Sequence, residues 1–138
     1  MCTHAKKDKN VEKSSLKTVV AFLNTDGGSL LIGVDDGGTI TGLQEEMDKF
    51  HKKSEDKFLL HFNNLIKDKI GEDFYPFVEY HIVNIDEMKV LFVECKPSTS
   101  PCFYNEEFFV RANPATNQLT GPKLINYIKR HFPDEAQG

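Results

Sequence analysis

The chain has 138 residues, of which 39% are hydrophobic and 28% are charged, and its formal net charge is −4. A chain of this size and composition forms one globular domain with its own core and needs neither disulfides nor a structural metal. The composition excludes a disordered chain, and the negative charge counts against an extensively basic surface without excluding a local basic patch.

No segment suggests a membrane or export. The longest apolar stretches, residues 19–23 and 30–34, are far shorter than the ~20 residues that span a bilayer. The start "MCTHAKKDKN" has no apolar signal core. Cys2, Cys95 and Cys102 are an odd number without CxxC spacing, which is typical of reduced thiols. We therefore expect a cytoplasmic protein with no membrane partner and no zinc site.

The first predicted element is a helix over residues 11–24. Its apolar positions have helical spacing: Leu16, Val19, Val20 and Leu23. The segment "NTDGG" ends this helix, because Asn and Asp tolerate tight turns and Gly27 or Gly28 can take positive φ. The apolar run "SLLIGV" that follows predicts a short strand buried on both faces.

A hairpin and two helices are predicted next. "DDGGT" between two β-prone runs predicts a hairpin in which Gly37 and Gly38 form the turn and "TITGL" returns. A short helix is expected at 43–51 and a longer one at 55–70, ended by Gly71. The longer helix has one apolar stripe, formed by Phe58, Leu59, Phe62, Leu65, Ile66 and Ile70.

The second half predicts three strands and a last helix. "FVEYHIV" alternates as a half-exposed strand, "KVLFVECK" returns as a more buried one, and "EEFFVRA" follows the proline-bounded loop "PSTSP". In "LTGPKLINYIKRHF", Thr120 suits the N-cap and Pro122 the first turn. Four residues of this helix are expected to face the core: Leu124, Ile125, Ile128 and Phe132.

Together these elements predict one α/β (α+β) domain, a mixed sheet of five to six strands flanked by three to four helices. The domain covers residues 11–133. Residues 1–10 are expected to be a polar tail or a fraying first turn, and residues 134–138 a C-terminal tail.

Several sites of known chemistry are excluded or left open. GxxxxGK[ST], GxGxxG and GxSxG are all absent, which counts against a standard ATPase, a dinucleotide site and a hydrolase elbow. The five histidines have no HExxH spacing. Asp35 and Asp36 suit either simple hairpin chemistry or one ligand of a divalent metal. Arg111, at a strand end, suits either a bidentate phosphate contact or a salt bridge.

Two long segments resemble the Schlafen AlbA-like domain, also called the divergent AAA group. They are "LKTVVAFLNTDGGSLLIGVDDGGTITGL" and "FFVRANPATNQLTGPKLINYIKRHF", and the similarity extends from about Leu16 to Phe132. The resemblance implies a mixed α/β fold and nucleic-acid binding, often within transcriptional regulators. In the late motif Arg111 and Thr116 remain, whereas Ala112 and Asn113 depart from the family pattern.

Some animal Schlafen proteins look like RNA-cleaving enzymes that use two glutamates of an ExxxxEFK-like segment and one aspartate after the glycine-bracketed strand. The aspartate corresponds to Asp35 or Asp36. The glutamates have no counterpart, because Glu12 lacks the EFK context. The resemblance therefore implies an incomplete catalytic centre.

We expect a nucleic-acid-binding domain with DNA or RNA as partner and no cofactor. The expected contacts are Arg111, Thr116, Lys123, Lys129 and Arg130. One alternative is a metal-dependent endoribonuclease that uses Asp35 and Asp36 with Mg²⁺ or Mn²⁺. Another is a non-catalytic homo-oligomerisation module.

Overall fold

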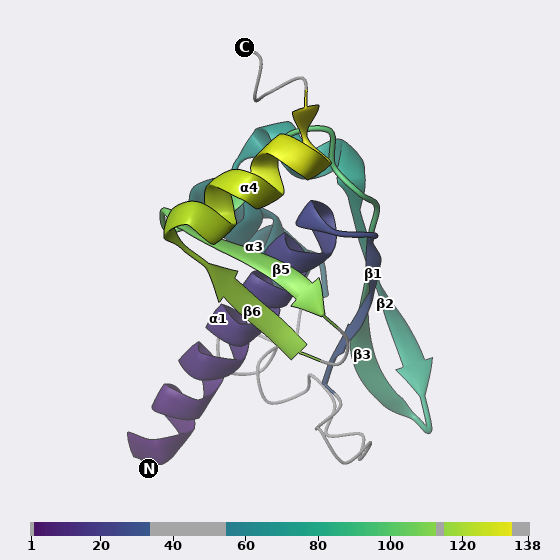
Figure 1. Ribbon diagram of the computed structural model, residues 1–138. Helices are drawn as coiled ribbons and strands as arrows, with labels where there is room; N and C mark the ends of the chain where they lie inside the picture. The colour runs from purple at the N-terminus through teal and green to yellow at the C-terminus, as the bar shows by residue number, and fades with distance from the viewer. Residues whose placement is uncertain (1, 34–54, 113–114, 134–138) are drawn as a thin grey trace.

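The structure is a computed structural model and describes residues 2–33, 55–112 and 115–133 (Figure 1). The described strands form two three-stranded antiparallel sheets, and a long helix, α1 (Cys2–Asn24), lies between them. The expected α+β domain is confirmed. The described strands are divided between two sheets instead of forming one mixed sheet.

The first sheet has the strand order β1-β3-β2. Its strands are β1 (Gly28–Ile32), β2 (Val78–Ile85) and β3 (Met88–Cys95). The pattern-based prediction for β1 was wrong in one respect: Leu30 and Ile32 pack on the core, but Leu31 is 38% exposed. An antiparallel sheet packs one face on the core, so an apolar strand in it still turns alternate side chains outward.

The second sheet has the order β4-β5-β6. Its strands are β4 (Phe103–Tyr104), β5 (Glu107–Ala112) and β6 (Ala115–Leu119). Only β5 was predicted. The sequence of β6, "ATNQL", has no apolar alternation, because most of the strand is solvent-exposed and its stability comes from pairing with β5.

Both two-residue hairpin turns in the described chain use residues with positive φ. Asp86 and Glu87 join β2 to β3 with φ values of 50° and 66°, and Asn105 and Glu106 join β4 to β5 with values of 50° and 68°. Two consecutive residues in this region define a type I′ turn, whose twist matches that of the flanking strands. No glycine is used at either turn.

The helices differ from the predictions at their ends and on one face. α1 begins at Cys2, so the helix starts nine residues before the predicted start at residue 11. α3 (Glu55–Lys69) and its apolar stripe are confirmed, and a 3₁₀-helix, η1 (Glu72–Phe77), follows it. In α4 (Gly121–His131), Ile125 was expected in the core but is 54% exposed.

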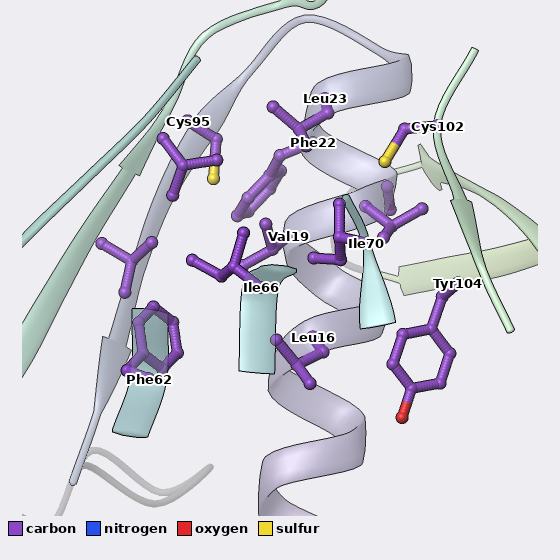
Figure 2. Packing of buried hydrophobic residues seen from close by; sticks show 14 of the residues in the cluster. Leu16, Val19, Phe22, Leu23, Phe62, Ile66, Ile70, Cys95, Cys102 and Tyr104 are labelled. Atoms are coloured by element: carbon purple, nitrogen blue, oxygen red, sulfur yellow. The ribbon is translucent and has the colours of Figure 1, made fainter. Parts of the chain in front are cut away.

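The C-terminal part of α1 forms the centre of the core (Figure 2). Every residue from Val19 to Asn24 is buried, so this part of the helix is covered on all sides. The first sheet and α3 cover one side of this part of α1, through residues such as Cys95 and Phe62. Strands β4 and β5 cover its other side. A helix end that is buried all round must have its polar backbone groups bonded within the protein.

Several predicted features lie outside the described residues: Asp35, Asp36, Gly37, Gly38, the returning strand "TITGL" and the helix at 43–51. The departure from the family pattern at Asn113 also lies there.

Candidate nucleic-acid interface

The last carbonyls of α1 are bonded by the turn that follows the helix. A helix leaves its final four carbonyls without partners inside the helix. The Thr25 hydroxyl donates to Ala21 O at 2.8 Å, and the Thr25 and Gly27 N–H groups donate to Phe22 O at 3.2 and 2.9 Å. The local segment "NTDGG" therefore satisfies two of the four carbonyls.

Distant segments bond the other two. The Ser98 N–H donates to Leu23 O at 2.9 Å, and the Ser98 hydroxyl oxygen lies 2.8 Å from the same carbonyl oxygen. The Tyr127 hydroxyl, on α4, donates to Asn24 O. The "PSTSP" loop and the last helix are thus both fixed to the end of α1.

The Asn24 side chain joins α1 to the second sheet. Its amide nitrogen donates to Cys102 O at 2.8 Å and to Phe109 O at 2.9 Å, and its amide oxygen accepts from the Cys102 N–H at 2.8 Å. Asn24 is fully buried, so these bonds form away from water, where an unpaired polar group is costly. The sequence had suggested only a turn-forming role for this residue.

The glycine pair after α1 is required by close packing. Gly27 has a φ of 78°, and a Cβ there would lie 2.6 Å from Cys95 O. At Gly28, a Cβ would lie 2.7 Å from the Phe22 ring. The first glycine lets the chain pass against β3, and the second makes room for Phe22.

Arg111 is held by groups of the protein itself. Its N–H donates to the Thr25 hydroxyl at 2.9 Å, and its guanidinium Nη1 donates to the Thr116 hydroxyl at 2.9 Å. The guanidinium carbon lies 5.3 Å from the centre of the Phe22 ring, a cation–π distance. Arg111 and Thr116 are half-buried and directly paired across β5 and β6.

The predicted contact residues do not share one surface. Successive residues of a strand point to opposite faces. Phe108 contacts Tyr127 of α4, with ring centres 5.8 Å apart, whereas Arg111 lies over Phe22 of α1. Arg111 and Thr116 therefore lie on the α1 side of the second sheet, and α4 packs against the other side.

The three basic residues predicted on α4 are all exposed: Lys123, Lys129 and Arg130. Lys123 and Arg130 are seven positions apart, about two helical turns, so they lie on the same side of the helix, whereas Lys129 lies on another side. A cation in the last turn of a helix is stabilised by the helix dipole, which accounts for Lys129 and Arg130. This explanation does not apply to Lys123, because it stands at the opposite end.

An aromatic cluster at the end of α4 was not predicted. The His131 ring stacks on the Tyr127 ring, with centres 5.0 Å apart and planes at 17°, and the Phe132 ring meets it edge-on at 4.8 Å. Burial raises the pKa of the Tyr127 hydroxyl. The one sequence signal was the four-residue spacing of Tyr127 and His131 on a helix.

Within residues 2–33, 55–112 and 115–133, no group of three or more His, Cys, Asp or Glu side chains is placed to hold a metal ion. None of the helices described is both long and apolar enough to cross a membrane.

The fold and the hydrogen bonds at the C-terminal end of α1 define a small α+β domain built around a buried helix. The sequence profile described as "Schlafen, AlbA_2" matches residues 3–120, and the chain belongs to this family. Among proteins with curated functions, none gives a significant match.

One similar solved structure is the DIP2311 protein from Corynebacterium diphtheriae. The two structures have a TM-score of 0.62 and 17% sequence identity. The similarity covers 89% of this chain and 20% of the chain of that protein, so this chain spans about a fifth of its length. At this identity the likeness shows a shared fold.

Proposed function

We propose that this domain binds nucleic acid, with Lys123 and Arg130 contacting phosphates from one side of α4. The observation that carries the proposal is membership of the Schlafen AlbA_2 family, which suggests a nucleic-acid-related domain. The exposed pair on α4 supports it, because phosphate contacts need cations that reach solvent. Lys129, on another side of the helix, contributes less.

Arg111 and Thr116 have a supporting role in this proposal. The guanidinium lies between the Thr116 hydroxyl and the Phe22 ring, and it faces away from α4. It fixes β6 to β5 and so holds the strand that leads directly into α4. The sequence alone had suggested that Arg111 itself contacts phosphate.

The expected affinity is modest and strongly salt-dependent. With a net charge of −4, the whole protein does not attract a polyanion, so binding depends on a local patch. Each phosphate contact contributes about 0.9 to the slope of log K against log salt on duplex DNA. Removal of two contacts should therefore lower the magnitude of that slope by about two.

The test measures fluorescence anisotropy of labelled single- and double-stranded DNA and RNA at ~50 mM salt, followed by a salt series. The double variant Lys123→Gln/Arg130→Gln should bind more weakly, and the magnitude of its salt slope should fall by about two on duplex DNA and by about 1.4 on a single strand. Lys129→Gln is the control for the loss of a charge elsewhere, because it removes one positive charge from another side of α4. The proposal fails if the unmodified protein binds none of the four ligands at ~50 mM salt.

A further inference from the structure

His131 is a solvent-exposed residue whose ring is held in a fixed orientation by two neighbouring rings. One face stacks on Tyr127, and Phe132 meets the ring edge-on, while the residue as a whole remains solvent-exposed. Tyr127 is fixed in turn, because its hydroxyl donates to Asn24 O and its ring contacts Phe108, a fully buried residue of β5. The ring is therefore anchored to the core through one intermediate side chain.

The ring lies beside the two proposed phosphate contacts, about 80–100° round α4 from them, and His131 directly follows Arg130 in the last turn. Lys123, Tyr127, Arg130 and His131 occupy positions i, i+4, i+7 and i+8 of the helix. Residues with this spacing form one continuous stripe along a helix. Lys129 and the exposed Ile125, which are four positions apart, fall outside this stripe.

A flat ring presented beside exposed cations has the chemistry that binds unpaired bases. Proteins bind single strands by stacking bases on aromatic side chains, His included, while cations hold the backbone. In a duplex each base is already stacked on its neighbours, so the same ring has no partner there. A ring already fixed before binding loses little conformational freedom on stacking.

We infer that His131 is a stacking platform for one unpaired base of a single strand whose phosphates contact Lys123 and Arg130. This inference rests on the proposed function and adds the class of nucleic acid. It differs from a purely structural role for His131, in which the ring only supports α4 through its stack on Tyr127.

The test compares the unmodified protein, His131→Ala and His131→Phe. The probes are a single-stranded oligonucleotide carrying 2-aminopurine, an abasic oligonucleotide of the same length, and a duplex. Replacement by Ala should weaken single-strand binding by about 5- to 150-fold, the range measured for loss of one stacked base. His131→Phe keeps a flat ring and should retain single-strand affinity and the quenching of 2-aminopurine fluorescence.

Binding of the duplex and of the abasic strand should be the same for all three proteins. Circular dichroism and thermal unfolding confirm that α4 is still folded in His131→Ala. The inference is overturned if His131→Ala, still folded, binds the single strand as well as the unmodified protein does. It is also overturned if the substitution weakens binding of the abasic strand by the same factor as binding of the complete strand. In either case, binding that still depends on Lys123 and Arg130 leaves the proposed function standing. If the unmodified protein binds no nucleic acid, both the inference about His131 and the proposed function are wrong.

Discussion

Asn24 and Cys102 form a reciprocal pair of hydrogen bonds, each 2.8 Å long, between the side-chain amide of one residue and the backbone of the other. The asparagine amide thereby takes the place of a peptide group from a neighbouring strand. Its second N–H bonds Phe109 O at 2.9 Å. One side chain therefore connects the end of α1 to two separate segments of the chain.

Replacement of Asn24 should destabilise the fold strongly. Asn24→Ala leaves three buried backbone groups without partners, and we expect a loss of about 3 kcal/mol or more in the free energy of unfolding. Asn24→Asp should cost at least as much, because an ionised carboxylate cannot donate to the carbonyls of Cys102 and Phe109. Urea unfolding measures both. Thr18→Ala, which removes a hydroxyl bonded only within α1, is the control and should change stability by less than about 1 kcal/mol.

The glycines after α1 should tolerate substitution far less than the glycine that begins α4. Gly27→Ala and Gly28→Ala each place a Cβ within 3 Å of other atoms, and we expect losses of about 2 kcal/mol or more. Gly121 also has positive φ, but a Cβ there meets nothing within 4 Å. Gly121→Ala should therefore cost only the backbone strain, about 1–2 kcal/mol. Equal losses at Gly27 and Gly121 would contradict the steric argument.

The hairpin turns offer positions where substitution should stabilise the protein. Glu87 and Glu106 stand at the second position of type I′ turns, where glycine is preferred. Glu87→Gly and Glu106→Gly should each raise the free energy of unfolding by about 0.5–1 kcal/mol, because they relieve the strain of positive φ. Glu107→Gly, one residue into β5, is the control and should destabilise. Thermal unfolding of the three variants gives the comparison.

Alkaline pH should destabilise the protein through its two buried thiols. Burial raises the pKa of Cys95 and of Cys102 from 9.0 to about 12. Between these values the unfolded chain releases the thiol protons and the folded protein keeps them. The contribution of the two thiols to the free energy of unfolding is therefore fully present below pH 9. It is lost as pH rises from there toward 12, by at most about 1.4 kcal/mol per pH unit for each thiol.

Urea midpoints at pH 7, 9 and 10 measure this loss, and Cys95→Ala/Cys102→Ala should show less of it. The same burial should make both thiols unreactive toward alkylating reagents in the folded protein at pH 8, since the thiolate is the reacting species. Peptide mapping distinguishes them from Cys2. Rapid native-state labelling of Cys95 or Cys102 would show that the core opens at this point.

Arg111→Gln separates the structural role of Arg111 from direct phosphate contact. The variant loses the cation–π contact with Phe22 and weakens the link to Thr116, so we expect a stability loss of about 1 kcal/mol. Nucleic-acid affinity and its salt slope should stay near those of the unmodified protein under folding conditions. A loss of binding comparable to that of Lys123→Gln/Arg130→Gln, with stability unchanged, would instead assign Arg111 to the interface.

Periodicity predicted the elements that pack one regular face on the core. The stripe of α3, the alternation of β2 and the more buried run of β3 follow directly from burial. Predictions from periodicity failed where strand pairing, or the packing of the last helix, determines the structure. Strand β6 is polar and forms because β5 is its partner, and in α4 Tyr127 is turned inward toward Phe108 while Ile125 faces solvent.

The candidate site was predictable only in part. Exposed lysines and arginines on the last helix can be read from sequence, because charge and helical spacing are local properties. Whether Arg111 shares their surface depends on which face of β5 it occupies, and β5 was predicted without its partners. The roles of Asn24 and Tyr127 depend on groups about eighty or a hundred positions away, which no local pattern reports.

The bonding at the end of α1 also bears on how the chain acquires its structure during synthesis. Four residues from later in the chain bond the polar groups at this helix end: Ser98, Cys102, Phe109 and Tyr127. They are the partners of Leu23 O, Asn24 O and the Asn24 side-chain amide. A nascent chain that has emerged only as far as β3 contains none of them, so its first helix exposes the polar end that the native core encloses. Folding is therefore expected to be late and cooperative, with α1 locking into place only once the final helix has been made.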